Sequence, residues 1–94
     1  VVVTDERVAP LHLTALRAGL EEAGFGIAAV ITVPPGEASK GFATLNRVLD
    51  EMLGAGIERR TGVVALGGGV VGDLAGFAAA VALRGLPFVQ VPTT

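Results

Sequence analysis

The residues from Gly67 to Asp73 have types and spacing that could do chemistry, because four glycines and an aspartate gather there. An apolar run at residues 63–66 leads into them, and a helix is predicted to begin among them. Glycines at a strand-to-helix junction let a ligand approach the backbone N–H groups closely. The positive end of the helix dipole favours phosphate there. The junction therefore predicts a site for a nucleotide or another phosphorylated ligand.

The glycines at residues 67–72 match the GxGxxG pattern, which is a weak signal by itself and stronger between a strand and a helix. Two details argue against an ordinary Rossmann fingerprint. The motif follows the third predicted strand, and no acidic residue stands about 20 residues further on. No Lys-Ser/Thr pair follows Gly72, which excludes a P-loop. The competing explanation is a tight turn with close packing, and we favour the ligand site.

Polar residues at other predicted junctions leave two interpretations open. Glu37 and Lys40 are three apart at a helix start, where they could bind a ligand or form an incidental ion pair. Asp73 is predicted in the first helical turn, where it complements the dipole or accepts hydrogen bonds from a sugar. The same ambiguity, between a structural role at the end of an element and a ligand contact, applies to Asp5, Arg84, Thr93 and Thr94.

The chain shows a binding surface without reacting groups of its own. Its single histidine, His12, has no other metal ligands spaced around it. The absence of cysteine excludes disulfides and thiolate metal sites within these residues. We therefore assign no catalytic residue and no metal ligand to this chain.

The order of elements predicts an α/β fold with a parallel sheet and flanking helices. Strands are predicted at residues 1–3, 27–33, 63–66 and 88–91. Helices are predicted from Pro10 to Ala23, from Ser39 to Leu53, and over residues 74–83, the last apolar all round and so buried on every side. Ligands bind beyond the carboxyl ends of such strands, where residues 34–40, 67–73 and 92–94 should converge.

Composition limits the partners. The chain has 94 residues, 51% of them hydrophobic, and a mean hydropathy of +0.66, which is apolar for a free-standing domain of this size. It begins on Val1 and stops after a strand-like run, so we expect a fragment of a larger protein. A net charge of −2 without a basic stripe argues against nucleic acid. The longest apolar run is about half a membrane span, and no signal peptide is visible, so a cytoplasmic location is expected.

Stretches along the whole chain together resemble one family, the 3-dehydroquinate synthases of the shikimate pathway. Residues 66–80, Arg84-Gly85 and residues 88–94 resemble its signature block. Residues 34–40 resemble its Gly-Glu-x-x-Lys segment, and residues 4–5 and 8–11 its N-terminal strand and turn. The resemblance covers essentially the whole chain.

The resemblance implies the Rossmann-like, NAD-binding N-terminal part of a two-domain enzyme. This family binds NAD and a divalent metal, zinc or cobalt, whose ligands lie in a helical C-terminal domain outside these 94 residues. It converts the phosphorylated sugar acid DAHP to 3-dehydroquinate with loss of phosphate, and NAD is regenerated, so there is no net redox change. The resemblance also implies a homodimer, and it implies that residues 1–94 alone are inactive.

Site residues follow from the same resemblance. Asp5 would lie against the adenosine part of NAD, and Arg84 would bind an anionic group of the substrate, across a dimer interface. Asp73 would bond to the nicotinamide end. The remaining NAD contacts would be Gly36, Glu37 and Lys40 near the ribose, Gly68, Gly69, Val70 and Gly72 at the pyrophosphate, and Thr93 and Thr94 at the strand end. Pro35 departs from the family, in which many members have Asp.

Other functions remain open at this stage. Sugar-phosphate cyclases that close different rings, such as 2-deoxy-scyllo-inosose or 2-epi-5-epi-valiolone synthases, share the glycine block. Metal-dependent polyol dehydrogenases share the architecture, but residues 84–94 fit them less well. A non-catalytic relative that keeps the nucleotide site is the alternative from a different class.

Overall fold

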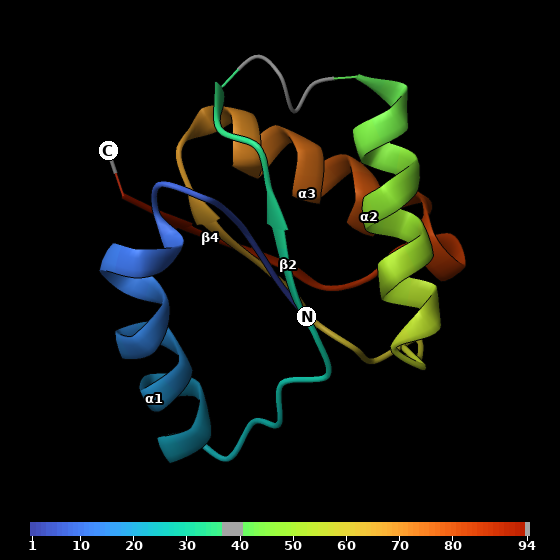
Figure 1. Cartoon of the computed structure of the whole chain (residues 1–94). Coiled ribbons are helices and arrows are strands. Elements are labelled where there is room, and N and C mark those ends of the chain that lie inside the picture. The colour runs from blue at the N-terminus through green and yellow to red at the C-terminus, as the bar shows by residue number, and fades with distance from the viewer. Residues whose placement is uncertain (37–40, 94) are drawn as a thin grey trace.

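The computed structural model describes residues 1–36 and 41–93. The strands are β1 (Val2–Asp5), β2 (Val30–Val33), β3 (Val63–Gly67) and β4 (Phe88–Pro92), all parallel in one sheet. The helices between them are α1 (Thr14–Glu22), α2 (Phe42–Gly54) and α3 (Gly69–Val81), shown in Figure 1. The predicted fold class, a Rossmann-like parallel sheet with flanking helices, is confirmed.

The strand order is β2-β1-β3-β4, so the winding of the sheet reverses next to β1. From β1 the chain moves outward to β2, and it then returns past β1 to β3 and β4. Consequently α1 lies on one side of the sheet, and α2 and α3 lie on the other (Figure 1). The carboxyl ends of β1 and β3 form the point of reversal, which is where doubly wound sheets bind ligands.

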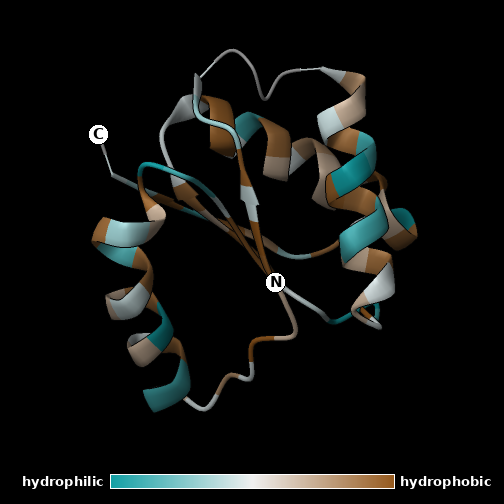
Figure 2. Cartoon of the chain, viewed as in Figure 1, coloured by the Kyte–Doolittle hydropathy of each residue, from teal (hydrophilic) through white to brown (hydrophobic). Residues whose placement is uncertain are grey.

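The two faces of the sheet are packed unequally. The main core lies under α2 and α3, where Val48, Met52 and Ala75 are completely buried between the helices and the strands. By contrast, α1 buries none of its residues. Figure 2 shows the same contrast: hydrophobic residues follow the strands and much of α3, while hydrophilic residues gather on α1 and α2. The face that carries α2 and α3 therefore holds the main hydrophobic core.

The prediction for α3 is wrong in its bounds and in its burial. The helix begins at Gly69 and ends at Val81, because the backbone of Ala82 is extended, with a ψ of 128°, and Leu83 follows with a φ of 46° in the left-handed region. Phe77 and Val81 are 55% and 49% exposed. The sheet and α2 cover only one side of α3, and no other part of the described chain covers its outer side.

Other boundaries also differ from the predictions. β2 begins at Val30 rather than residue 27, and a π-helical turn, η1 (Ala9–Leu13), precedes α1. α2 begins at Phe42, and the predicted start at Ser39 lies outside the described residues. Phe42 is 83% exposed although it belongs to the predicted apolar stripe, so Val48 and Met52 supply the buried contacts of α2.

Candidate functional site

The carboxyl ends of the parallel strands lie at one edge of the sheet, and the described parts of the three predicted segments, residues 34–36, 67–73 and 92–93, lie at the ends of β2, β3 and β4 there. β1 ends at Asp5, and Gly67 of β3 pairs with Pro92 of β4. The backbone N–H of Thr93 donates to the carbonyl oxygen of Gly67 at 3.3 Å. The end of β4 is thus fixed beside the glycine turn, as the convergence of strand ends predicted.

The glycine turn is closely packed at Gly67 and open at Gly69. A Cβ at Gly67 would lie 3.1 Å from the side chain of Val71, so this position requires a very small residue. Gly68 is the N-cap of α3, and a Cβ at Gly69 would meet nothing within 4 Å. The first N–H groups of a helix lack partners within the helix. The turn therefore presents free backbone donors to an accessible space, which suits an anion.

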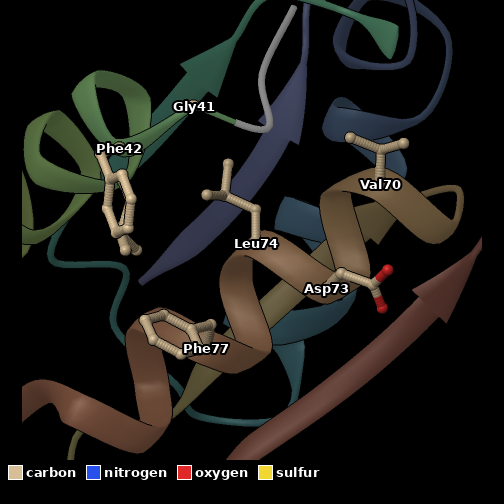
Figure 3. Close-up of a pocket in the computed structure, with 7 residues that line it drawn as sticks. Gly41, Phe42, Val70, Asp73, Leu74 and Phe77 are labelled. Carbon is tan, nitrogen blue, oxygen red and sulfur yellow. The ribbon is translucent and has the colours of Figure 1, made fainter. Parts of the chain in front are cut away.

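Asp73 lies in the second turn of α3, and the prediction of the first turn is wrong. The cause is the early start of the helix, which has Gly68 as its N-cap. The first helical hydrogen bond runs from the N–H of Gly72 to the carbonyl oxygen of Gly68, at 3.0 Å, so Asp73 already follows the first turn. Asp73 is exposed, and Figure 3 shows its carboxylate directed away from Phe42, Leu74 and Phe77. Dipole complementation is correspondingly weaker there.

Asp5 has a structural role that the geometry defines. Its Oδ1 accepts hydrogen bonds from the backbone N–H groups of Arg7 and Val8, both at 2.8 Å. The carboxylate thereby fixes the turn that leads into η1. Within the described chain Oδ2 has no hydrogen-bond partner, so one oxygen remains for a ligand.

Thr93 carries an unsatisfied polar atom at the same edge. Its Oγ1 is buried and has no hydrogen-bond partner among the described residues. A buried hydroxyl without a partner costs about 1–3 kcal/mol. A group that is unfavourable for folding at the end of a strand is a candidate ligand contact.

Two cavities flank the first turns of α3. The larger, of about 410 Å³, lies between α2 and α3. Figure 3 shows its lining residues: Gly41, Phe42, Leu45, Val70, Asp73, Leu74 and Phe77. The smaller, of about 130 Å³, lies between the glycine turn and β4. Its lining residues are Ala65, Gly67, Gly68, Gly69, Gly72, Gln90 and Pro92. The smaller cavity touches the glycines directly and has the more polar lining.

Arg84 lies at the opposite edge of the sheet. α3 has 13 residues and so carries the chain about 20 Å from the glycine turn to the amino ends of the strands. There Arg84 lines a cavity of about 310 Å³ with Arg59 and Leu83. The structure therefore does not bring Arg84 together with the other site residues of this chain.

The remaining candidates are placed in part or lie outside the description. Gly36 follows β2 with a φ of 71°, which favours glycine. Glu37, Lys40 and Thr94 lie outside the described residues. Over residues 1–36 and 41–93, no three His, Cys, Asp or Glu side chains form a group that could hold a metal. Over the same ranges, no helix is both long and apolar enough to span a membrane.

Gln90 lines the smaller cavity at the glycine turn, and the sequence analysis did not single it out. It is the one polar residue within the sequence FVQVP of β4. Strand alternation places it on the same face as Phe88 and Pro92, the face toward α3. A polar residue inside an apolar strand, one strand beyond the glycine turn, was the available signal.

Fold and site together define a class, the Rossmann-like N-terminal domain of sugar-phosphate cyclases. A solved 2-deoxy-scyllo-inosose synthase complexed with carbaglucose-6-phosphate, NAD⁺ and Co²⁺ matches with a TM-score of 0.88 at 27% identity, over 98% of this chain and 25% of that one. A 2-epi-5-epi-valiolone synthase from Streptomyces hygroscopicus, with NAD⁺ and Zn²⁺ bound, matches with a TM-score of 0.86 at 34% identity, over 99% of this chain and 26% of that one.

The family model described as 3-dehydroquinate synthase N-terminal matches residues 30–94, and the chain belongs to this family. The 3-dehydroquinate synthase of Mesorhizobium japonicum is 57% identical over 99% of this chain and 24% of its own length. That of Pelobacter propionicus is 55% identical over 99% of this chain and 26% of its own length. The chain thus spans about a quarter of the length of the curated relatives it matches.

Proposed function

We propose that the protein carrying this chain is a 3-dehydroquinate synthase, a lyase that converts DAHP to 3-dehydroquinate with loss of phosphate. The observation that carries the proposal is the open glycine turn at the reversal point of the sheet, in a chain 57% identical to a protein of that name. In this proposal residues 1–94 are the N-terminal NAD-binding domain of a cytoplasmic enzyme, and they are inactive alone.

The residues present fit NAD as the cofactor. The donors of the glycine turn suit a pyrophosphate, and the unpartnered Oγ1 of Thr93 suits a further polar contact. When bound, NAD supplies reversible hydride transfer. The chain itself would hold the pyrophosphate on the backbone of Gly68, Gly69 and Val70, and Gly72, whose own N–H is bonded to the carbonyl of Gly68, would leave room beside them. Asp5, Gly36, Glu37, Lys40, Thr93 and Thr94 would contact the rest of the adenosine and ribose portion.

Asp73 would orient the nicotinamide end by accepting hydrogen bonds. The position in the second turn of α3 supports this role, because it lies one turn beyond the pyrophosphate cradle with an exposed carboxylate. Zinc or cobalt would be bound by residues outside this chain, since the chain offers no group of ligands among its described residues.

Arg84 would act on the substrate of a second protomer. Its place at the amino edge, beyond the end of α3, leaves it about a helix length from the glycine turn of its own chain. An arginine that binds an anionic substrate group from there must reach a neighbouring copy. The proposal therefore includes a homodimer.

Another sugar-phosphate cyclase is the alternative, favoured by the close structural match to a 2-deoxy-scyllo-inosose synthase. The identity of 27% to that structure, against 57% to a 3-dehydroquinate synthase, makes it the second choice. A metal-dependent polyol dehydrogenase is a third candidate and would produce NADH.

The test is release of inorganic phosphate from DAHP by the full-length protein, with NAD and zinc or cobalt, while absorbance is followed for NADH. Phosphate release without accumulation of NADH supports the proposal. NADH formed from a polyol, without phosphate release, would move the protein to the dehydrogenases. Phosphate release from a hexose phosphate but not from DAHP would identify another cyclase.

Asp73→Ala in the full-length protein is expected to abolish turnover while the protein stays folded, because the residue is exposed and packs little. Asp50→Ala, an exposed aspartate on α2, is the matched control and should keep full activity. Normal turnover by Asp73→Ala would remove the assigned role of Asp73.

A further inference from the structure

The side chain of Gln90 occupies the space that a side chain at Gly72 would fill. A Cβ at Gly72 would overlap Nε2 of Gln90 and lie 3.1 Å from its Cδ. The carboxamide therefore reaches the backbone of α3 only because residue 72 has no side chain. Gly72 is buried in the first turn of the helix, so the carboxamide lies beside the glycine turn.

The contact belongs to a matched spacing between helix and strand. Gly72 and Gly76 are one turn apart on α3, about 6 Å along the helix. Gln90 and Phe88 are two residues apart on β4, about 6.6 Å along the strand. A Cβ at Gly76 would lie 3.3 Å from the ring of Phe88. Two glycines thus let α3 lie close on β4, and each receives one side chain of the strand.

The two side chains differ in their capacity for hydrogen bonds. The ring of Phe88 needs no hydrogen bond. The carboxamide of Gln90 has two donor hydrogens and an acceptor oxygen, and none of them has a partner among the described residues. Gln90 instead lines the cavity of about 130 Å³ together with Gly68 and Gly69.

We propose that the amide of Gln90 donates a hydrogen bond to the anionic centre of the dinucleotide held by the glycine turn, and that Gly72 keeps space for that amide. The inference rests on the proposed function and extends its list of ligand contacts. Backbone N–H groups of the turn and the side-chain NH₂ of Gln90 meet at one cavity, and these donors together suit phosphate oxygens. The side chain of Gln90, from β4, thereby completes a cradle that is otherwise made of backbone N–H groups.

The first test is NAD binding to the full-length protein, measured by calorimetry. Gln90→Met keeps the length of the side chain but removes the donors, and about 10- to 100-fold weaker binding is expected for a hydrogen bond to a charged group. Gln90→Glu should bind more weakly than Gln90→Met, because it places a carboxylate beside phosphate. Wild-type affinity in Gln90→Met would overturn the inference. Failure of the unmutated protein to bind NAD would overturn the proposed function as well.

The second test uses Gly72→Ala, which should displace the amide without removing it. The added methyl meets only the flexible end of Gln90, so the fold should tolerate it. The variant should lose NAD affinity about as much as Gln90→Met, and the double variant should lose no more than either single one. Gly19→Ala, where a Cβ meets nothing within 4 Å, is the control. Additive losses in the double variant would show two separate effects and contradict the pairing.

Discussion

Two contacts between α3 and β4 have the same architecture and different chemistry. At Gly76 the helix accepts the ring of Phe88, and at Gly72, one turn nearer the carboxyl edge, it accepts the carboxamide of Gln90. Both glycines allow a close approach of helix and strand. Only the contact at Gly72 borders the glycine turn and its cavity.

The difference indicates that one contact of α3 with β4 serves stability and the other serves ligand binding. The Gly76–Phe88 contact is complete within the described chain, since an aromatic ring against a helix backbone leaves no polar atom unsatisfied. The Gly72–Gln90 contact leaves a carboxamide without partners, as Thr93 leaves a hydroxyl at the end of the same strand. A buried hydroxyl without a partner and an exposed carboxamide that is free to bind thus both lie toward the carboxyl edge of β4, where the proposed ligand would contact them.

The largest expected effect is that of Gly76→Val on stability. The new side chain would enter the space of the Phe88 ring, which lies 3.3 Å from the position of the Cβ. Overpacking of this kind costs about 1–3 kcal/mol. The apparent midpoint of thermal unfolding of the full-length protein should fall by several degrees, while the folded fraction binds NAD normally.

Gly19→Val is the control for this change, because a Cβ at Gly19 in α1 meets nothing within 4 Å. It introduces the same residue into a helix without a clash. Equal midpoints for the two variants would show that the Phe88 contact does not limit the size of residue 76. The contacts at Gly76 and Gly72 would then differ only in the polarity of the side chain from β4, and not in how tightly they are packed.

A smaller effect, of opposite sign, is expected from Thr93→Val. Valine keeps the shape of threonine and removes the buried, unpartnered hydroxyl, which should stabilise the protein without NAD by about 1 kcal/mol. NAD binding should weaken, because the hydroxyl is a proposed ligand contact. Thr93→Ser, which keeps the hydroxyl, should bind NAD more tightly than Thr93→Val. A valine variant that binds NAD as the wild type does would remove Thr93 from the site.

Local patterns in the sequence were sufficient to predict the sheet and the glycine turn. Strand-like apolar runs that alternate along the chain with helical stripes predicted a parallel sheet. The glycines after residues 63–66 predicted where a ligand would approach. The sequence did not predict that α3 begins at Gly69, because an apolar helix of small residues lacks a polar cap to mark its start. Asp73 was consequently placed one turn too early.

The role proposed for Gln90 depends on a tertiary contact that no local pattern contains. Its position in β4 follows from alternation, but its meeting with Gly72 requires the register of α3 on the sheet. The distance of Arg84 from the turn likewise follows only from the length and direction of α3. Sequence motifs identified the other candidate residues, and the fold shows which of them lie at the same edge of the sheet.

The smallest expected effect on stability completes the comparison, and it is that of Gln90→Met. The carboxamide makes no hydrogen bond within the described chain, and Gln90 is exposed on its strand. Its replacement by a side chain of similar length should change the free energy of unfolding by less than about 0.5 kcal/mol. Thermal unfolding without NAD should therefore resemble that of the wild type, and the stabilisation produced by added NAD should be smaller, since ligand stabilisation follows affinity. A marked loss of stability without NAD would instead make Gln90 a packing residue like Phe88, and the two contacts of α3 would then have one role.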